Sequence, residues 1–304
     1  MNNIPAPPLE WGVRTYIMGI INVTMDSFSG DGLMRHQDAV KAACLQAERF
    51  LEEGADILDV GGESTRPGAK PVDEQEEIRR VVPVIEKIHQ RFPNIAISID
   101  TYKPAVAREA LCAGASWVND IWGFHANPEL AKVVAEYDVP VILMHNRLQA
   151  GTAIHEAHLG SRYVGTKYKD LIGDICRDLM ESVCLAHKMG IPDEHIILDP
   201  GIGFGKSVQQ NLELINHLDS IKALGYPILV GPSRKSFIGF TLDLPPDERI
   251  EGTAAAVALC IDRGADIVRV HDVGVMARVV RMTDAVVRRN NGKFDHQESL
   301  HKEA

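Results

Sequence analysis

The sequence is poor in cysteine and lacks any long hydrophobic run. Its five cysteines form no Cys-x-x-Cys pair, and all of them fall in segments whose apolar spacing predicts helices. This pattern excludes a disulfide or zinc framework and indicates free thiols in a reducing cytoplasm. No stretch approaches the ~18 consecutive apolar residues of a membrane span, and the opening MNNIPAPPLEW has no signal-peptide character. We therefore expect a cytoplasmic protein without a membrane partner.

Basic residues are outnumbered by acidic ones. The chain has 32 Lys and Arg against 42 Asp and Glu, a net charge of −10. A nucleic-acid-binding surface needs a basic excess, so we expect no nucleic-acid partner, and an anionic substrate must meet a local basic site. The 304 residues are 45% hydrophobic and 24% charged, near the globular average, which excludes disordered, collagenous and coiled-coil chains.

Short apolar runs alternate with longer amphipathic segments along the chain. The runs expected as strands are Tyr16–Val23, Ile57–Val60, Ile95–Asp100, Trp117–Asp120, Val139–Met144, His195–Asp199, Pro227–Val230 and Ile267–Val270. The segments with helical spacing are residues 37–53, 73–91, 104–113, 128–137, 164–189, 208–224, 250–263 and 274–290. The pattern thus consists of repeated strand–helix units.

Strands that are apolar on both faces belong in a buried parallel sheet, so eight such units predict a (β/α)₈ TIM barrel. We expect the barrel to be a single domain over residues 15–290, after an N-terminal extension at 1–14 and before a disordered tail at 291–304. A doubly wound sheet stays open as the alternative, although no G-x-G-x-x-G follows the first strand.

Polar residues stand at the carboxyl ends of the expected strands, which lie on one face of a parallel barrel. Asp59, Asp100, Asp120 and Asp199, together with Asn119, can hydrogen-bond along the amidine-like edge of a 2-aminopyrimidinone ring. In the alternative, each aspartate caps a helix or pairs with a barrel arginine. The sequence therefore predicts an active site at this face.

Basic residues cluster on the same face. They are Arg66, Arg234, Lys235, Arg269 and His271. Arginine grips phosphate oxygens with two parallel hydrogen bonds, and phosphate sites in barrels commonly lie near strands seven and eight. We therefore expect a diphosphate to bind here. Alternatively, Arg234 and Arg269 serve as structural ion-pair partners.

Two loops, residues 24–36 and 61–71, are rich in Gly, Ser and Pro, as is typical of lids that close over a substrate. A third insertion at 147–164 indicates no function. The segment Asp199–Ser207 is not a phosphate loop, because Pro200 stands where that motif requires glycine. No Ser-His-Asp order, G-x-S-x-G elbow or strand-end cysteine is present, so we expect no covalent catalysis by the protein.

Nine motifs resemble those of dihydropteroate synthases in order and spacing, over residues 15–285. They are Met18–Thr24 (MGIINVT), Asp26–Ser29 (DSFS), Asp59–Gly68 (DVGGESTRPG), Ser98–Lys103 (SIDTYK), Asn119–Ile121 (NDI), Leu143–His145 (LMH), Asp199–Lys206 (DPGIGFGK), Ser233–Phe237 (SRKSF) and Arg269–Val273 (RVHDV). The resemblance implies a folate-pathway transferase that joins 6-hydroxymethyl-7,8-dihydropterin diphosphate to p-aminobenzoate and releases diphosphate.

The resemblance also implies a role for individual residues. The pterin is expected to contact Asp100, Asn119, Met144, Asp199, Phe204, Lys235 and Arg269, of which Asp100, Asp199, Lys235 and Arg269 would be catalytic. The diphosphate is expected to contact Asn22, Thr65, Arg66, Arg269 and His271, with Mg²⁺ near Asn22. The p-aminobenzoate pocket is expected to use Phe28, Thr65, Pro67, Lys235 and Ser236, and sulfonamides are the expected inhibitors. Family members are commonly homodimers through the last helices, where residues 275–287 carry an apolar stripe.

Three positions depart from the usual family pattern. Met25 replaces a proline, the stretch Ser29–Gly32 carries one extra glycine, and His145–Arg147 differs from the commoner motif. Two alternatives stay open. One is a pterin-binding methyltransferase barrel, which has no use for the S-T-R-P loop or the R-x-H pair. The other is an inactive paralogue that acts as a binding subunit.

Overall fold

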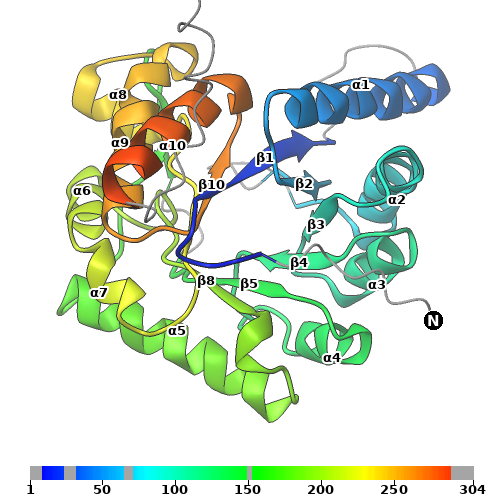
Figure 1. Ribbon diagram of the computed structural model, residues 1–304, viewed down its shortest axis with the longest axis horizontal. Helices are drawn as coiled ribbons and strands as arrows, with labels where there is room; N and C mark the ends of the chain where they lie inside the picture. The colour runs from blue at the N-terminus through cyan, green and yellow to red at the C-terminus, as the bar shows by residue number, and fades with distance from the viewer. Residues whose placement is uncertain (1–8, 24–31, 65–70, 149–152, 289–304) are drawn as a thin grey trace, which may run out of the picture.

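The computed structural model describes residues 9–23, 32–64, 71–148 and 153–288. Eight parallel strands form a barrel in these residues: β1 (Tyr16–Asn22), β2 (Ile57–Gly61), β3 (Ala96–Asp100), β4 (Trp117–Asp120), β5 (Val141–Met144), β8 (Ile196–Asp199), β9 (Leu229–Val230) and β10 (Ile267–Val270). Their order is β8-β5-β4-β3-β2-β1-β10-β9, and a parallel bridge between Leu198 and Ile228 closes the ring. Figure 1 shows the strands from β8 round to β10 in this order. The predicted TIM barrel is confirmed.

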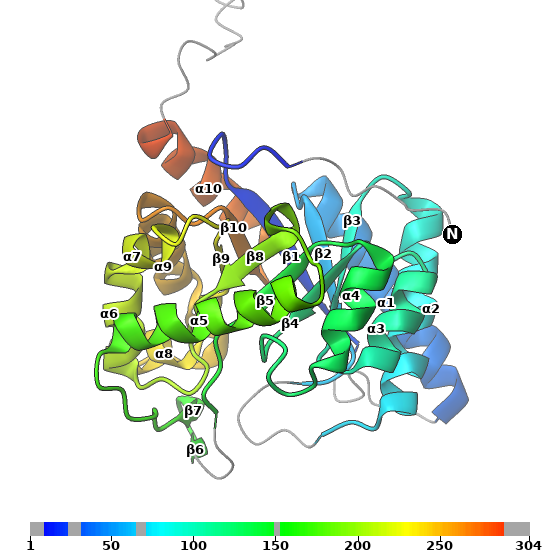
Figure 2. The same cartoon turned by 90° about the horizontal axis from the view of Figure 1, so that it is seen from below.

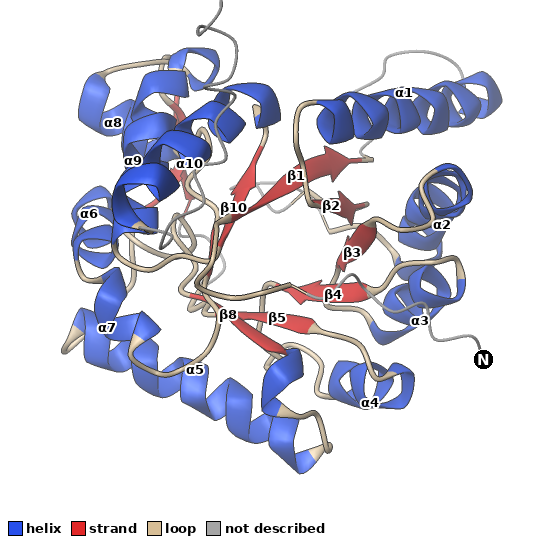
Figure 3. Cartoon of the chain, in the orientation of Figure 1, coloured by secondary structure: helices blue, strands red, loops and turns tan. Residues whose placement is uncertain are grey.

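Helices surround the strands, as Figure 3 shows. They are α1 (Gly32–Glu52), α2 (Glu74–Arg91), α3 (Pro104–Cys112), α4 (Glu129–Tyr137), α5 (Leu171–Lys188), α6 (Val208–Asn216), α7 (Leu218–Lys222), α8 (Ser236–Leu242), α9 (Ile250–Asp262) and α10 (Val273–Val287). Local signals set several of their starts. Asp73 caps α2 by accepting a hydrogen bond from the Glu76 N–H, and Ser207 forms a capping box with Gln210 at the start of α6. The five cysteines are free and all lie in helices, as predicted.

The period of two along each strand separates the core into an outer and an inner part. Leu58 and Val60 of β2 pack outward with the helices, whereas Ile57 packs inward with side chains from the other strands. The inner cluster consists of Tyr16, Met18, Ile57, Ala96, Trp117, Ile142, Ile197, Leu229 and Ile267, and Leu9 and Trp11 pack against it. The amino-terminal half of the barrel interior is therefore filled with apolar side chains.

The same alternation makes the carboxyl-terminal half of the interior polar. Two residues beyond Ile57 on β2 comes Asp59, two beyond Trp117 on β4 comes Asn119, and two beyond Ile267 on β10 comes Arg269. Side chains two apart on a strand point to the same face, so these residues enter the same interior one layer higher. The fold thus gathers the polar strand-end residues at the mouth of the barrel.

The structure corrects the sequence-based prediction at several elements. Two antiparallel strands, β6 (Ala153–Glu156) and β7 (Gly160–Tyr163), form an unpredicted hairpin in the 147–164 insertion, which projects from the barrel in Figure 2. Helix α5 begins at Leu171 rather than 164, and α8 was not predicted. The segment 208–224 is divided into α6 and α7 at His217. The loop expected at 24–36 is helical from Gly32 onward.

Among the described helices, none combines the length and the apolar character needed to cross a membrane.

Substitutions of buried and exposed leucines test the packing of the barrel. Leu130 on α4 is fully buried, whereas Leu45 on α1 is 54% exposed. We expect Leu130→Ala to lower the free energy of unfolding by about 2–5 kcal/mol, because it loses apolar burial and leaves a cavity. The matched Leu45→Ala should change it by less than about 0.5 kcal/mol. Urea denaturation followed by circular dichroism measures both, and equal effects would contradict the packing described here.

Candidate active site

An arginine that spans two aspartates occupies the mouth of the barrel. Arg269 on β10 donates from Nε to Asp59 Oδ2 of β2 at 2.6 Å and from Nη2 to Asp100 Oδ2 of β3 at 2.7 Å. Asn119 Nδ2 on β4 also donates to Asp59 Oδ2, at 3.2 Å. Residues up to 210 positions apart in the chain thus form one hydrogen-bonded group.

The charges in this group are held away from water. Desolvation raises the pKa of Asp100 to about 7, although Arg269 opposes the shift; Asp59, Glu77 and Asp120 add to it. Desolvation alone would lower the pKa of Arg269, but Asp59 and Asp100 hold it above its usual range. The Oδ1 atom of Asp59 is buried and has no hydrogen-bond partner in the described part of the chain. The mouth therefore holds carboxylate oxygens that can accept further hydrogen bonds.

Asp199 and Lys235 extend the group across the mouth. Asp199, at the end of β8, is buried, which raises its pKa, and its Oδ1 accepts a hydrogen bond from the Gly201 N–H at 2.7 Å. Lys235, the residue before α8, donates from Nζ to the Ile202 carbonyl. Desolvation lowers the pKa of Lys235 to about 7, while Asp199 opposes this shift.

An apolar wall lies beside these charges. Ile121, Met144 and Phe204 form a buried cluster at the mouth, and Lys235 Nζ lies 4.0 Å from the centroid of the Phe204 ring. Gly203 has a φ of +84°, which favours glycine, and a Cβ there would lie 2.3 Å from Lys235 Cδ and displace the lysine stem. The wall and the charges together suit a flat heteroaromatic ring with a polar edge.

The glycine-rich loop after β8 wraps around a buried lysine. Lys206 is 2% exposed and donates from Nζ to the carbonyls of Gly201 at 2.9 Å and Phe204 at 3.2 Å. Its third contact is Nδ1 of His145, at 3.1 Å. Desolvation lowers the pKa of Lys206 to about 7 and the pKa of His145, which also faces Lys206, to about 3. His145 is therefore neutral near pH 7, and Lys206 fixes the shape of the loop that carries Phe204.

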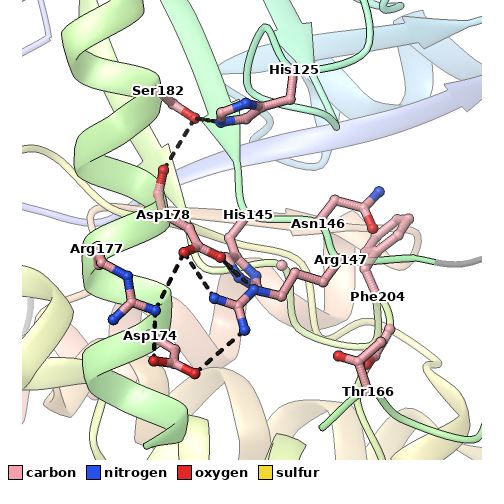
Figure 4. A network of polar contacts seen from close by, with 12 residues as sticks. His125, His145, Asn146, Arg147, Thr166, Asp174, Arg177, Asp178, Ser182 and Phe204 are labelled. Atoms are coloured by element: carbon pink, nitrogen blue, oxygen red, sulfur yellow. Dashed lines mark hydrogen bonds and ion pairs between the residues drawn. The ribbon is translucent and has the colours of Figure 1, made fainter. Parts of the chain in front are cut away.

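Helix α5 supports this arrangement from outside the barrel (Figure 4). Asp178 accepts hydrogen bonds from Arg147 Nε at 2.5 Å and contacts His145 Nε2 at 3.2 Å. Arg147 also reaches Asp174, which pairs with Arg177. Since an ionised carboxylate only accepts hydrogen bonds, neutral His145 donates from Nε2 to Asp178 and offers Nδ1 as an acceptor to Lys206. This network ties α5 to the glycine-rich loop through His145.

A second set of groups follows β9 and β10. His271 donates from its backbone N–H to Ser233 Oγ at 3.2 Å, and its Nδ1 lies 3.0 Å from the same hydroxyl. Arg234 pairs with Asp272 and is not part of the charged group around Arg269. For Arg234, the structural ion-pair alternative is therefore correct. Arg269 lies at the mouth and is also an ion-pair partner.

The structure places the other predicted residues as follows. Asn22 is exposed at the end of β1, and Ser236 is the first residue of α8, next to Lys235. Phe28, Thr65, Arg66 and Pro67 lie outside the described residues. Neither carboxylate oxygen of Asp120 is left to bind a pterin beside Arg269. Its two oxygens accept from the N–H groups of Trp122 and Phe124, at 2.9 and 2.7 Å, so it caps the turn after β4.

Lys103, Glu63 and Glu77, which received no role in the sequence analysis, form a hydrogen-bonded cluster beside the second long loop, residues 61–71. Lys103 Nζ donates to Glu63 Oε2 at 2.6 Å, to the Val72 carbonyl at 2.8 Å and to Glu77. Glu63 Oε2 in turn accepts from the Val72 N–H at 3.0 Å. These contacts join the two described ends of the 61–71 loop. Glu63 and Lys103 belong to two of the motifs quoted above, so the sequence marks both residues as important. Only the fold shows that they contact each other.

The described residues include no group of three or more His, Cys, Asp or Glu side chains arranged to hold a metal ion. Asn22, the one predicted metal ligand, is an exposed residue at the carboxyl end of β1.

The chain is similar in sequence and in fold to known proteins. The family described as "Pterin binding enzyme" matches residues 18–271. Dihydropteroate synthase of Clostridium beijerinckii is 52% identical over 91% of this chain and 96% of its own length. A crystal structure of the synthase from Clostridium difficile in the presence of pteroic acid has a TM-score of 0.83 and 46% identity, and covers 93% of this chain and 100% of its own. The structure of the Xanthomonas albilineans synthase with 4-aminobenzoic acid has a TM-score of 0.80 and 40% identity. The match covers 90% of this chain and 94% of the Xanthomonas chain.

Removing Arg269 tests the electrostatics of the mouth. We expect Arg269→Met to lower the free energy of unfolding by about 3–5 kcal/mol, because it leaves buried carboxylates without their cation. Without the guanidinium the pKa of Asp100 rises above its value of about 7, so the folded variant binds more protons than the folded wild type above that pH. The deficit in stability should therefore be larger at pH 9 than at pH 6.

Urea denaturation at the two pH values measures this difference. The control is Arg108→Met, which breaks the exposed ion pair between Arg108 and Glu136. Arg108→Met should hardly change the free energy of unfolding at either pH. A deficit for Arg269→Met that is the same at pH 6 and pH 9 would show that Asp100 does not respond to Arg269.

Proposed function

Because this chain belongs to the dihydropteroate synthases, a family of pterin-binding enzymes, we propose that it condenses 6-hydroxymethyl-7,8-dihydropterin diphosphate with p-aminobenzoate. The products are 7,8-dihydropteroate and diphosphate, so the reaction is the transfer of a pterinylmethyl group in folate biosynthesis. The observation that supports this function best is the group formed by Arg269, Asp59 and Asp100 beside Asn119, Asp199 and Lys235 at one mouth.

The pterin ring is recognised by its polar edge and by its flat faces. Asp100, Asn119 and Asp199 supply acceptors and a donor for the amidine-like edge. Met144 and Phe204 form an apolar wall against the ring, and Lys235 lies over that wall. Arg269 completes the slot, where its planar guanidinium stacks on the ring.

The reaction needs no nucleophile from the protein. Departure of diphosphate leaves a positive charge on the pterin methylene that spreads into the ring, and the buried carboxylates of Asp100 and Asp199 stabilise this charge in the transition state. The neutral arylamine is already a nucleophile, so it attacks the methylene carbon and the protonated amine that forms then loses its acidic proton to water; no strong general base is required. Arg269 and His271 stabilise the leaving diphosphate, together with Thr65 and Arg66.

A magnesium ion fits the chemistry of this mouth. Mg²⁺ prefers oxygen ligands and is usually bound by one or two protein oxygens together with substrate phosphates, and Asn22, which is exposed at the end of β1, would supply its amide oxygen. Bound there, the ion supplies charge neutralisation for the departing diphosphate. The p-aminobenzoate pocket uses Phe28, Thr65, Pro67, Lys235 and Ser236. Sulfonamides, which mimic p-aminobenzoate, are the inhibitors that we expect to bind in this pocket.

The proposed activity is tested by mixing the purified protein with the dihydropterin diphosphate, labelled p-aminobenzoate and Mg²⁺. Dihydropteroate and diphosphate should form, and omission of Mg²⁺ should slow turnover. Asp100→Asn and Lys235→Ala should each weaken pterin binding by about 10- to 100-fold, because a hydrogen bond to a charged group is lost. Titration calorimetry with a pterin measures this loss.

The control variant is His155→Ala, since His155 is exposed on β6 and far along the chain from the assigned residues. It should leave both turnover and pterin affinity unchanged. Absence of product while both substrates stay intact would rule out the synthase activity. Unchanged pterin affinity in Asp100→Asn or Lys235→Ala would show that these residues are wrongly assigned.

We also propose that the protein is a cytoplasmic homodimer. Five free cysteines suit a reducing compartment. On α10, Met276 and Val280 are buried against the barrel, whereas Met282 and Val286 are 66% and 62% exposed. Nearby, α6, α8 and α9 line an apolar groove of about 240 Å³ that includes Leu242 and Leu259, which are 48% and 52% exposed. Large exposed apolar side chains of this kind are typical of subunit interfaces.

Charge insertion tests the dimer. We expect the wild type to sediment as a dimer and Leu259→Glu to sediment largely as a monomer, because the substitution buries an unpaired carboxylate in the interface. Leu45→Glu, at an exposed leucine of α1, should leave the sedimentation coefficient unchanged. Identical sedimentation of all three proteins would exclude this surface as the interface.

A further inference from the structure

A buried arginine outside the mouth has only backbone partners. Arg249 is 3% exposed, and its guanidinium donates to the carbonyls of Arg234 at 3.0 Å, Leu159 at 2.9 Å and Leu244 at 3.1 Å. Burial lowers the pKa of Arg249, and Asp247 opposes this shift without a hydrogen bond to the guanidinium in the part of the chain that the structure describes. Burying a charge that is hydrogen-bonded only to carbonyls is costly, so a guanidinium in this position indicates a specific task for its five donors.

The task concerns the backbone of Arg234, which has a φ of +56°. Residues with a side chain rarely adopt this left-handed conformation. Asp138 and Asp243 also have positive φ values, but each ends a helix, where such a residue is common. Arg234 instead precedes α8, so its conformation must be held by its surroundings.

At the start of α9, its N-cap residue Arg249 and Thr253 in its first turn hold both polar backbone groups of Arg234. Arg249 Nη1 donates to its carbonyl, and its N–H donates to Thr253 Oγ1 at 3.0 Å. The Thr253 hydroxyl proton is directed to the Arg249 carbonyl at 2.7 Å, which leaves a lone pair of Oγ1 for the Arg234 N–H. Arg249 and Thr253 are one helical turn apart, so they form a rigid pair, which we call the α9 clamp.

The residue after the clamped turn is Lys235. Its backbone direction sets the course of its side chain across Gly203 to the Ile202 carbonyl and the Phe204 ring. Gly203, which has no Cβ, leaves the space that this side chain crosses. We propose that Arg249 and Thr253 are positioning residues for Lys235, and that they act by holding Arg234 in the left-handed conformation. This inference rests on the proposed function for the role of Lys235 in catalysis.

The β6–β7 hairpin covers the α9 clamp. Leu159, between the two strands, supplies one of the three carbonyls to Arg249. Arg162 of β7 lies with its guanidinium carbon 4.7 Å from the centroid of the Phe240 ring on α8. The 147–164 insertion, for which the sequence indicates no function, thus completes the hydrogen bonding of the Arg249 guanidinium.

The central test is Thr253→Val, which keeps the shape of the side chain and removes the acceptor for the Arg234 N–H. We expect kcat/KM for the dihydropterin diphosphate to fall about tenfold, since Lys235 is displaced from its productive position. Thr253→Ser, which keeps the hydroxyl, should restore the wild-type value. The matched control is Thr283→Val, which loses an equivalent hydrogen bond to the carbonyl four residues earlier on α10 and should leave kcat/KM unchanged.

A double-mutant cycle separates positioning from helix stability. Glycine adopts positive φ values freely, so the turn no longer needs the clamp in an Arg234→Gly background. In that background Thr253→Val should lower kcat/KM by less than about twofold. Arg234→Ala also loses the ion pair with Asp272 but keeps a Cβ, so in the Arg234→Ala background Thr253→Val should still lower kcat/KM about tenfold. An equal loss in both backgrounds, or no loss in an active enzyme, would overturn the proposal.

A structural readout keeps this test independent of the activity. In a crystal structure of Thr253→Val, Lys235 Nζ should leave the Ile202 carbonyl, and in Arg234→Gly/Thr253→Val it should return. If the wild type makes no dihydropteroate, the proposed function fails, while the position of Lys235 still decides the role of the clamp. Lys235 in its wild-type position in Thr253→Val would refute the clamp whatever the activity.

Discussion

The contact of one guanidinium with two carboxylates governs the mouth of this barrel. Arg269 donates to both Asp59 and Asp100, which come from two other strands of the sheet. Without that cation, two acidic groups would face each other in a buried space, which would destabilise the mouth of the barrel. The charges that we propose to recognise the pterin also hold the strand ends together, so stability and the proposed recognition share the same atoms.

The positions of these groups could largely be predicted from the sequence. Strand–helix alternation predicts a parallel barrel, and the topology alone then brings Asp100, Asn119, Asp199 and Arg269 to one face. The period of two along each strand explains why they point inward above the apolar layer. Asp120 shows the limit of this reasoning. It stands at a strand end like the others, but the backbone of the following turn takes both its oxygens, and no residue pattern reveals that turn.

The elements that the sequence did not reveal depend on contacts between backbone groups distant in the chain. Helix α8 has only seven residues and follows the left-handed Arg234, so its start carries none of the usual capping residues. The β6–β7 hairpin has no strong alternation of apolar residues, and it is held by the carbonyl that it offers to Arg249. Lys206 and Arg249 are similar cases, since each is a buried cation whose partners are mainly carbonyl oxygens. A carbonyl belongs to every residue, and therefore leaves no signature in the sequence.

Gly203 has a consequence for any inhibitor that is built against the mouth. Even a single methyl group at this position would lie 2.3 Å from the stem of Lys235. A compound that presses on the backbone here touches a surface that point mutation cannot reshape without displacing the lysine. Resistant variants would have to arise elsewhere, so contact with this stretch of main chain narrows the routes by which a population can escape the drug.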